Sequence, residues 1–181
     1  MAVAVIMLPA AVGIALPAPA HGAGALNAAG PVGGLADKIR HQLLMLPYYG
    51  VFDNLEFEVQ EDGTVVLSGQ AMRPTLKSDA ENVVRRLPGV GEIINRIEVL
   101  PLSGFDDQIR IAVYRALFSS TQLDRYALGA IPAIHIIVKN GNVTLVGFVA
   151  TQTDKNVAGI VANGVPGTFS LTNNLTVERK G

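Results

Sequence analysis

Apolar and polar positions follow two different periods from Leu35 onward. Apolar residues three or four positions apart predict a first helix, at Leu35, Ile39, Leu43 and Leu46. Pro47 ends that helix. Period-two alternation through 55–59 and 64–71 then predicts two strands joined by an Asp62-Gly63 turn. Asp-Gly between two alternating runs indicates a hairpin, because glycine adopts positive φ without steric cost.

A second helix and a third strand complete this unit. The helix begins near Pro74, ends at Pro88-Gly89 and carries one apolar stripe. The stripe consists of Leu76, Ala80, Val83, Val84 and Leu87. A last strand follows over about 92–100. The predicted order of elements is therefore α-β-β-α-β.

The rest of the chain repeats the unit. Special residues recur 78 positions apart: Gly63 and Gly141, Gly69 and Gly147, Lys77 and Lys155, Pro88-Gly89 and Pro166-Gly167, and Asn95 and Asn173. The opening helices, at 37–40 and 107–110, repeat at an offset of 70. The second copy therefore holds about eight extra residues between its first helix and its first strand.

The second copy predicts the same elements, with a first helix over 105–118, an Asn140-Gly141 turn and a closing strand over 169–177. The expected core stripe of its second helix is Val157, Ile160, Val161 and Val165. The expected outward positions of that helix include Ala158, Gly159 and Ala162, where small side chains permit close approach of another element. The sequence thus predicts an α+β fold of two tandem α-β-β-α-β modules, at 35–101 and 104–178. Each module has a three-stranded sheet packed on two helices.

The N-terminal segment differs from the rest in composition. Residues 1–36 contain no Lys, Arg, Asp or Glu, and 2–16 are almost wholly apolar. This apolar run is shorter than the span of about 20 residues that a bilayer needs, and its length is typical of a signal-peptide core. We expect a signal peptide over 1–23, a flexible leader over 24–34 and a periplasmic or secreted protein. The alternative is an uncleaved membrane anchor.

Composition and motifs exclude several kinds of site. The net charge of −1 gives no strong basic field for nucleic acid. The chain has no cysteine, so it has no disulfide and no thiolate site. His21, His41 and His135 lack the short spacing of zinc ligands, and no nucleophile is paired with a base. We therefore expect no catalysis, no metal and no cofactor.

The repeated motif resembles a known family. It reads Gly63-Thr64-Val65-Val66-Leu67-Ser68-Gly69 on the hairpin, then Pro88-Gly89-Val90 after the helix, then Asn95 in the last strand. This pattern is similar to the BON domain of osmotically inducible and nodulation-associated bacterial proteins. The second copy departs from it, with Thr168 after Pro166-Gly167. The resemblance implies an envelope protein without catalytic residues, which binds phospholipid or acts as an adapter at membranes. The motif glycines themselves are interpreted as structural.

The helix 105–118 is apolar on two faces. Ile109, Val113 and Leu117 form the face expected in the core, whereas Ile111, Tyr114 and Phe118 cluster on the opposite face. A second apolar face either packs against the first module or the inserted loop, or contacts a lipid or a partner protein.

The loop before the first strand of each module is rich in apolar and aromatic residues. The loops contain Tyr48, Tyr49 and Phe52 in the first copy, and Arg125 and Tyr126 in the second. Tyrosine suits interfaces, since its ring is apolar and its hydroxyl stays hydrated. The alternative is that these residues close the ends of the module cores.

The hypothesis is a non-enzymatic envelope protein that binds phospholipid membrane surfaces, with an adapter for another envelope protein as the alternative. Arg110, Arg115 and Arg125 are candidate phosphate contacts. The apolar candidates are Ile111, Tyr114, Phe118, Tyr126, Tyr48, Tyr49 and Phe52.

Overall fold

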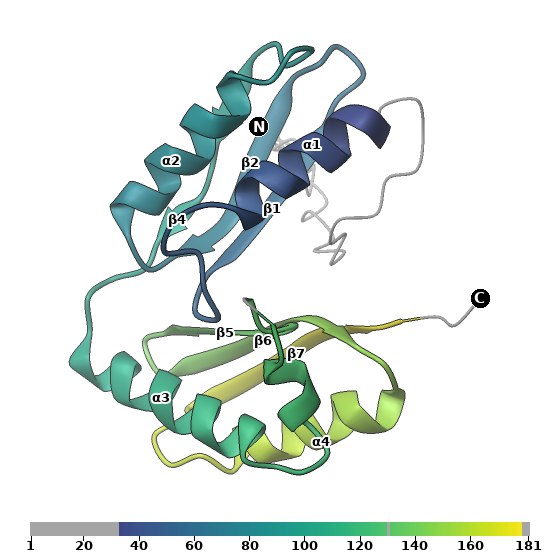
Figure 1. Cartoon of the computed structure of the whole chain (residues 1–181). Helices are drawn as coiled ribbons and strands as arrows, with labels where there is room; N and C mark the ends of the chain where they lie inside the picture. The colour runs from purple at the N-terminus through teal and green to yellow at the C-terminus, as the bar shows by residue number, and fades with distance from the viewer. Residues whose placement is uncertain (1–32, 130, 179–181) are drawn as a thin grey trace, which may run out of the picture.

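The structure, a computed structural model, describes residues 33–129 and 131–178. They form two successive modules of helices packed on a sheet (Figure 1). The signal peptide or anchor predicted at 1–23 lies outside the described residues, as does the leader up to residue 32.

The first module follows the predicted α-β-β-α-β order. It contains α1 (Gly33–Leu44), β1 (Asn54–Val59), β2 (Val65–Ala71), α2 (Pro74–Arg85), β3 (Ile93–Asn95) and β4 (Glu98–Val99). β1 is antiparallel to β2, whereas β3 and β4 run parallel to β2 on its other side. The closing strand, predicted as one run, is interrupted at Arg96 and Ile97, and Ile97 is buried in the core.

The second module repeats the order with one addition. It contains α3 (Gly104–Phe118), the short 3-10 helix η1 (Asp124–Ala127), β5 (Ile134–Lys139), β6 (Asn142–Val149), α4 (Gln152–Asn163) and β7 (Ser170–Val177). The sheet order is β5-β6-β7, with β5 and β6 antiparallel and β6 and β7 parallel. η1 lies in the predicted insertion between the first helix and the first strand.

In each module both helices cover one face of the sheet, and α3 and α4 lie on the side of their sheet away from the first module (Figure 1). The stripe predicted for α2 is confirmed, because Leu76, Ala80 and Val84 are buried and Val83 and Leu87 pack against the same core. The face of each sheet that carries no helix is turned toward the other module.

The core stripe predicted for α4 is confirmed at Val157, Val161 and Val165 and wrong at Ile160. The prediction that Ala158 and Ala162 point outward was also wrong. Ala158 and Ala162 are fully buried, while Ile160 is 74% exposed. The physical reason is the close approach of α4 to β7: a Cβ added to Gly159 would lie 2.8 Å from the amide nitrogen of Asn173. Only small side chains fit between these two elements, so the bulky Ile160 points to solvent.

The repeated residues have structural roles. Gly69 and Gly147 have φ of 100° and 116°, and a Cβ on Gly69 would lie 2.0 Å from the carbonyl oxygen of Asn54. Both glycines therefore allow a backbone approach that no other residue permits. Asn95 and Asn173 donate from their side-chain amides to the carbonyl oxygens of Lys77 and Lys155, at 3.0 and 2.7 Å. Each asparagine thus ties its closing strand to the second helix of its module.

Candidate functional site

The two modules meet along the loop that precedes β1. The backbone N–H of Ile136 in β5 donates to the carbonyl oxygen of Val51 at 2.8 Å. The rings of Tyr49 and His135 stack with centroids 5.6 Å apart, and His135 Nδ1 lies 3.2 Å from the carbonyl oxygen of Gly50. The loop therefore docks on the edge of β5 by a main-chain hydrogen bond as well as by side chains.

Asp53 fixes the shape of this loop. Its carboxylate is buried and accepts the N–H of Gly50 at 3.0 Å and the N–H of Met72 at 2.7 Å. Burial raises the pKa of Asp53, and these two hydrogen bonds offset part of that rise. The loop is thus held by β2 before it reaches the second module.

The outer face of α3, defined here as Ile111, Tyr114, Arg115 and Phe118, lies beside this junction. Tyr114 contacts Phe52 of the first module and Phe118 of its own helix, with ring centroids 6.1 and 4.9 Å apart. Packing against the first module, one of the two alternatives, is therefore present at Phe52. Coverage is partial, because Ile111 is 46% exposed and Tyr114 36%. The open part of the face can still receive another molecule.

The three candidate arginines lie in different surroundings. Arg110 is 1% exposed, its Nη2 donates to the carbonyl oxygen of Val138 at 2.6 Å, and its Nη1 pairs with Asp107. Its guanidinium is therefore turned into the protein and is not accessible to a phosphate, contrary to the expectation from sequence. Arg115 is exposed on α3. Arg125 is half exposed and belongs to the network around Asp154.

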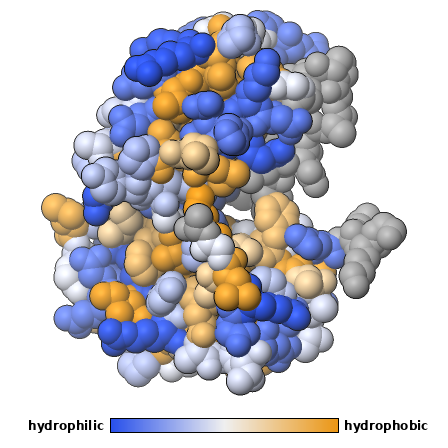
Figure 2. All heavy atoms as spheres, in the orientation of Figure 1, coloured by the Kyte–Doolittle hydropathy of each residue, from blue (hydrophilic) through white to orange (hydrophobic). Residues whose placement is uncertain are grey.

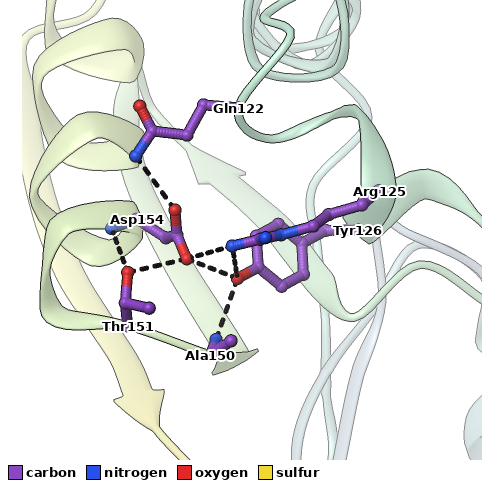
Figure 3. Close-up of polar contacts among 6 residues, drawn as sticks. All are labelled: Gln122, Arg125, Tyr126, Ala150, Thr151 and Asp154. Carbon is purple, nitrogen blue, oxygen red and sulfur yellow. Dashed lines mark hydrogen bonds and ion pairs between the residues drawn. The ribbon is translucent and has the colours of Figure 1, made fainter.

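Tyr126 and Arg125 converge on Asp154, a buried acid that sequence reasoning had not singled out (Figure 3). The hydroxyls of Tyr126 and Thr151 each donate to Asp154 Oδ2 at 2.8 Å, and Gln122 donates to Oδ1 at 3.0 Å. Arg125 pairs with the same carboxylate. These contacts tie the inserted segment to the first turn of α4.

The network holds Asp154 ionised. Burial by itself would raise the pKa of this carboxyl. The hydrogen bonds from Tyr126, Thr151 and Gln122, together with the charge of Arg125, outweigh burial and lower the pKa to about 2. Tyr126 is 8% exposed and its hydroxyl also accepts the N–H of Ala150 at 2.8 Å. Tyr126 thus closes the module core, which was the alternative to an exposed contact.

Of the remaining aromatic candidates, two lie at the junction between the modules and one is exposed to solvent. Tyr49 and Phe52 belong to the junction described above, whereas Tyr48 is 71% exposed. The guanidinium of Arg73 lies 4.7 Å from the centroid of the Tyr48 ring. Met45 is exposed nearby in the same turn. The end of α1 therefore presents a second exposed apolar and cationic surface.

A cavity of about 560 Å³ lies between the helix-free faces of the two sheets. Its walls include Glu56, Ser68 and Arg96 from the first module, and His135, Thr144 and Asn174 from the second. Apolar residues gather where the two modules meet on the side shown in Figure 2. Sequence reasoning missed the cavity because it depends on how the modules pack.

Two further observations bear on what the chain can bind. Among residues 33–129 and 131–178, no group of three His, Asp or Glu side chains could hold a metal ion. In the same part of the chain, no helix combines the length and apolar character required to cross a bilayer.

Comparison with known proteins matches both halves of the chain. The family profile described as BON domain matches residues 32–101 and again residues 106–179. No curated protein matches the sequence significantly. Among solved structures, the chain is similar to the C-terminal domain of CdsD, the structural protein of the type III secretion system of Chlamydia trachomatis. That match has 11% identity and a TM-score of 0.30, and covers 79% of this chain and 96% of the other. A second structure of CdsD matches at 12% identity with the same TM-score, covering 80% and 92%.

Proposed function

Because this chain belongs to the BON domain family, whose domains are binding modules, we propose that it binds phospholipid membrane surfaces in the envelope through the outer face of α3. The observation that carries the proposal is the exposure of Ile111 and Tyr114 next to the exposed Arg115. Apolar side chains enter the boundary between headgroups and acyl chains, and a neighbouring cation pairs with the lipid phosphate. We place the protein in the periplasm or outside the cell, and assign it neither catalysis nor a cofactor.

The partial cover over this face supports the same function. Tyr114 is held by Phe52 and Phe118, so its ring loses little conformational freedom when it enters a membrane. Tyrosine also suits the interface itself, since its ring is apolar and its hydroxyl stays with the headgroups. Attachment would therefore involve both modules, through Phe52 and through α3.

Co-sedimentation with vesicles tests the proposal. We expect the full chain to sediment with phosphatidylethanolamine vesicles that contain phosphatidylglycerol, and to dissociate as salt rises. The double variant Ile111→Ser, Arg115→Gln should lose most of this binding. The matched control is Ile160→Ser, Arg86→Gln, which removes an exposed isoleucine from α4 and the exposed arginine at the C-cap of α2. Equal binding by the two double variants would contradict the role of α3.

A second candidate function, an adapter for another envelope protein, is favoured by the surface at Tyr48. An exposed tyrosine stacked under an arginine is a combination enriched in protein interfaces. Capture of a partner from envelope extract that persists after lipid removal, and is lost in Tyr48→Ser, would support this role in place of lipid binding.

A further inference from the structure

We propose that the cavity between the two sheets is a binding site for a short carbohydrate of one or two sugar units. This inference goes beyond membrane attachment, because the cavity does not include the outer face of α3. Its volume of about 560 Å³ falls within the range of roughly 300–1,000 Å³ typical of small-molecule sites.

Strand register places polar side chains in rows across both walls. On the first sheet, Glu56 pairs with Ser68, and Arg96 lies in the break between β3 and β4, where its backbone N–H donates to the carbonyl oxygen of Leu67. On the second sheet, His135 pairs with Val146, which pairs with Asn174. All of these residues line the cavity. The first wall therefore presents side chains from β1, β2 and the segment between β3 and β4, and the second presents side chains from three adjacent strands, to one shared cavity.

Several of these polar groups have no protein partner. Within the described residues, no hydrogen bond or ion pair is made by the side chains of Ser68, Arg96, Thr144, Asn174 and Thr176. By contrast, Asn173 next to Asn174 is fully used, since its amide donates to Lys155 and its oxygen accepts the N–H of Leu175. Unpaired donors and acceptors that line one cavity are suited to a polar ligand.

The chemistry of the walls favours a sugar over a lipid chain. An acyl chain in this space would leave the hydroxyls of Thr144 and Thr176 and the amide of Asn174 without partners, which is unfavourable. Sugar hydroxyls both donate and accept, so they complement these groups. Phe148 and Tyr49, which also line the cavity, offer apolar surface to the C–H face of a sugar ring.

The walls also favour a sugar over an extended peptide. A peptide that adds to a sheet needs a free strand edge. The cavity is bounded by sheet faces, where the backbone groups of β2 and β6 are already paired in the ladders on both sides. Recognition must therefore come from side chains. Glu56 and Arg96 have opposite charges, which suits a ligand without net charge.

Titration of the ¹⁵N-labelled full chain with defined probes tests the site. The probes are the N-acetylglucosamine disaccharide and maltose, with triglycine and a short-chain phosphatidylglycerol as the other ligand classes. We expect one of the two disaccharides, at millimolar concentration, to shift amide resonances on β2 and β6 together. Thr176→Val and Asn174→Ala should each weaken this binding about tenfold. A tenfold change in affinity equals about 1.4 kcal/mol, which is the contribution expected of one hydrogen bond.

Thr172→Val is the matched control, since Thr172 lies on the same strand and face as Thr176 but does not line the cavity. It should bind the disaccharide as the unchanged protein does. Absence of shifts with both disaccharides would overturn the proposal, as would equal weakening by Thr172→Val and Thr176→Val. Binding of triglycine or lipid alone in the cavity would overturn it too. Unchanged thermal unfolding of each variant excludes misfolding as the cause of lost binding.

Discussion

Asp154 occupies in the second module the helix position that Leu76 occupies in the first. Each is the third residue of its helix, and each is buried, with exposures of 2% and 1%. The residues that surround the acid, Gln122, Arg125 and Tyr126, come from the longer connection between α3 and β5. A buried charge at this helix position and an inserted segment thus depend on each other, and the first module has neither.

We predict that Asp154→Leu, which introduces the residue of the first module, destabilises the protein. The change leaves the Tyr126 hydroxyl and the Arg125 guanidinium without their acceptor, and it releases η1 from α4. Leaving the buried Tyr126 hydroxyl without its acceptor typically costs about 1–3 kcal/mol of unfolding free energy, whereas the half-exposed Arg125 can be hydrated. Urea unfolding of the full chain measures the loss, with Thr153→Leu, an exposed change on the same helix, as the control. Equal stability of Asp154→Leu and the unchanged protein would show that the network contributes nothing.

A pH dependence follows from the same carboxyl. Because the pKa of Asp154 is about 2 in the folded protein and near 3.8 when unfolded, its contribution is complete above about pH 4. The contribution is lost as the pH falls toward 2, since the unfolded chain then takes up the proton first. We expect the stability difference between the unchanged protein and Asp154→Asn to shrink over this interval. Urea unfolding at pH 5, 3.5 and 2 measures it, and a difference that stays constant would contradict the assigned pKa.

The sequence predicted the order of elements, because hairpin turns, helix-ending prolines and the repeat offset are local features. Helix and strand ends agree with the prediction within a few residues, as at Pro74 and Phe118. On α4 the burial of Ala158 and Ala162 was missed, since periodicity favours large apolar residues such as Ile160 over alanine. The repeat offset of 78 positions nevertheless indicates that both alanines are buried, because it aligns Ala158 and Ala162 with the buried Ala80 and Val84.

The candidate site was less predictable, because it depends on contacts between distant segments. The loop around Phe52 was predicted as a contact surface, but its docking on β5 brings together residues about 85 positions apart. Arg110 was predicted as a phosphate contact, but its side chain is buried and donates to the carbonyl oxygen of Val138. The cavity and the role of Asp154 both require the packed structure.

The backbone at Gly147 gives a further prediction. With φ at 116° and a Cβ that would lie 2.1 Å from the carbonyl oxygen of Ala133, Gly147→Ala requires β5 and β6 to separate locally. We expect a loss of at least about 2 kcal/mol in unfolding free energy, in the range for strained backbone positions. Gly104→Ala is the control, because nothing lies within 4 Å of its added Cβ at the start of α3. Thermal or urea unfolding of both variants distinguishes strain from a general effect of alanine.

The junction between the modules should weaken in mild acid. Burial lowers the pKa of His135 below its usual 6.5, although hydrogen bonds near Asp53 and Gly50 offset part of this effect. The docked state therefore resists protonation, and stability falls as the pH drops through 6.5, where the unfolded or undocked chain binds the proton more readily.

His135→Phe keeps an aromatic ring against Tyr49 and removes the titrating group, so it should abolish the pH dependence of docking between pH 7.5 and 5. The amide resonance of Ile136, whose N–H donates to Val51, reports on docking directly. His41→Gln, at an exposed position on α1, should retain the pH dependence of the unchanged protein. If His135→Phe showed the same pH profile as His41→Gln, protonation of His135 would not control the junction.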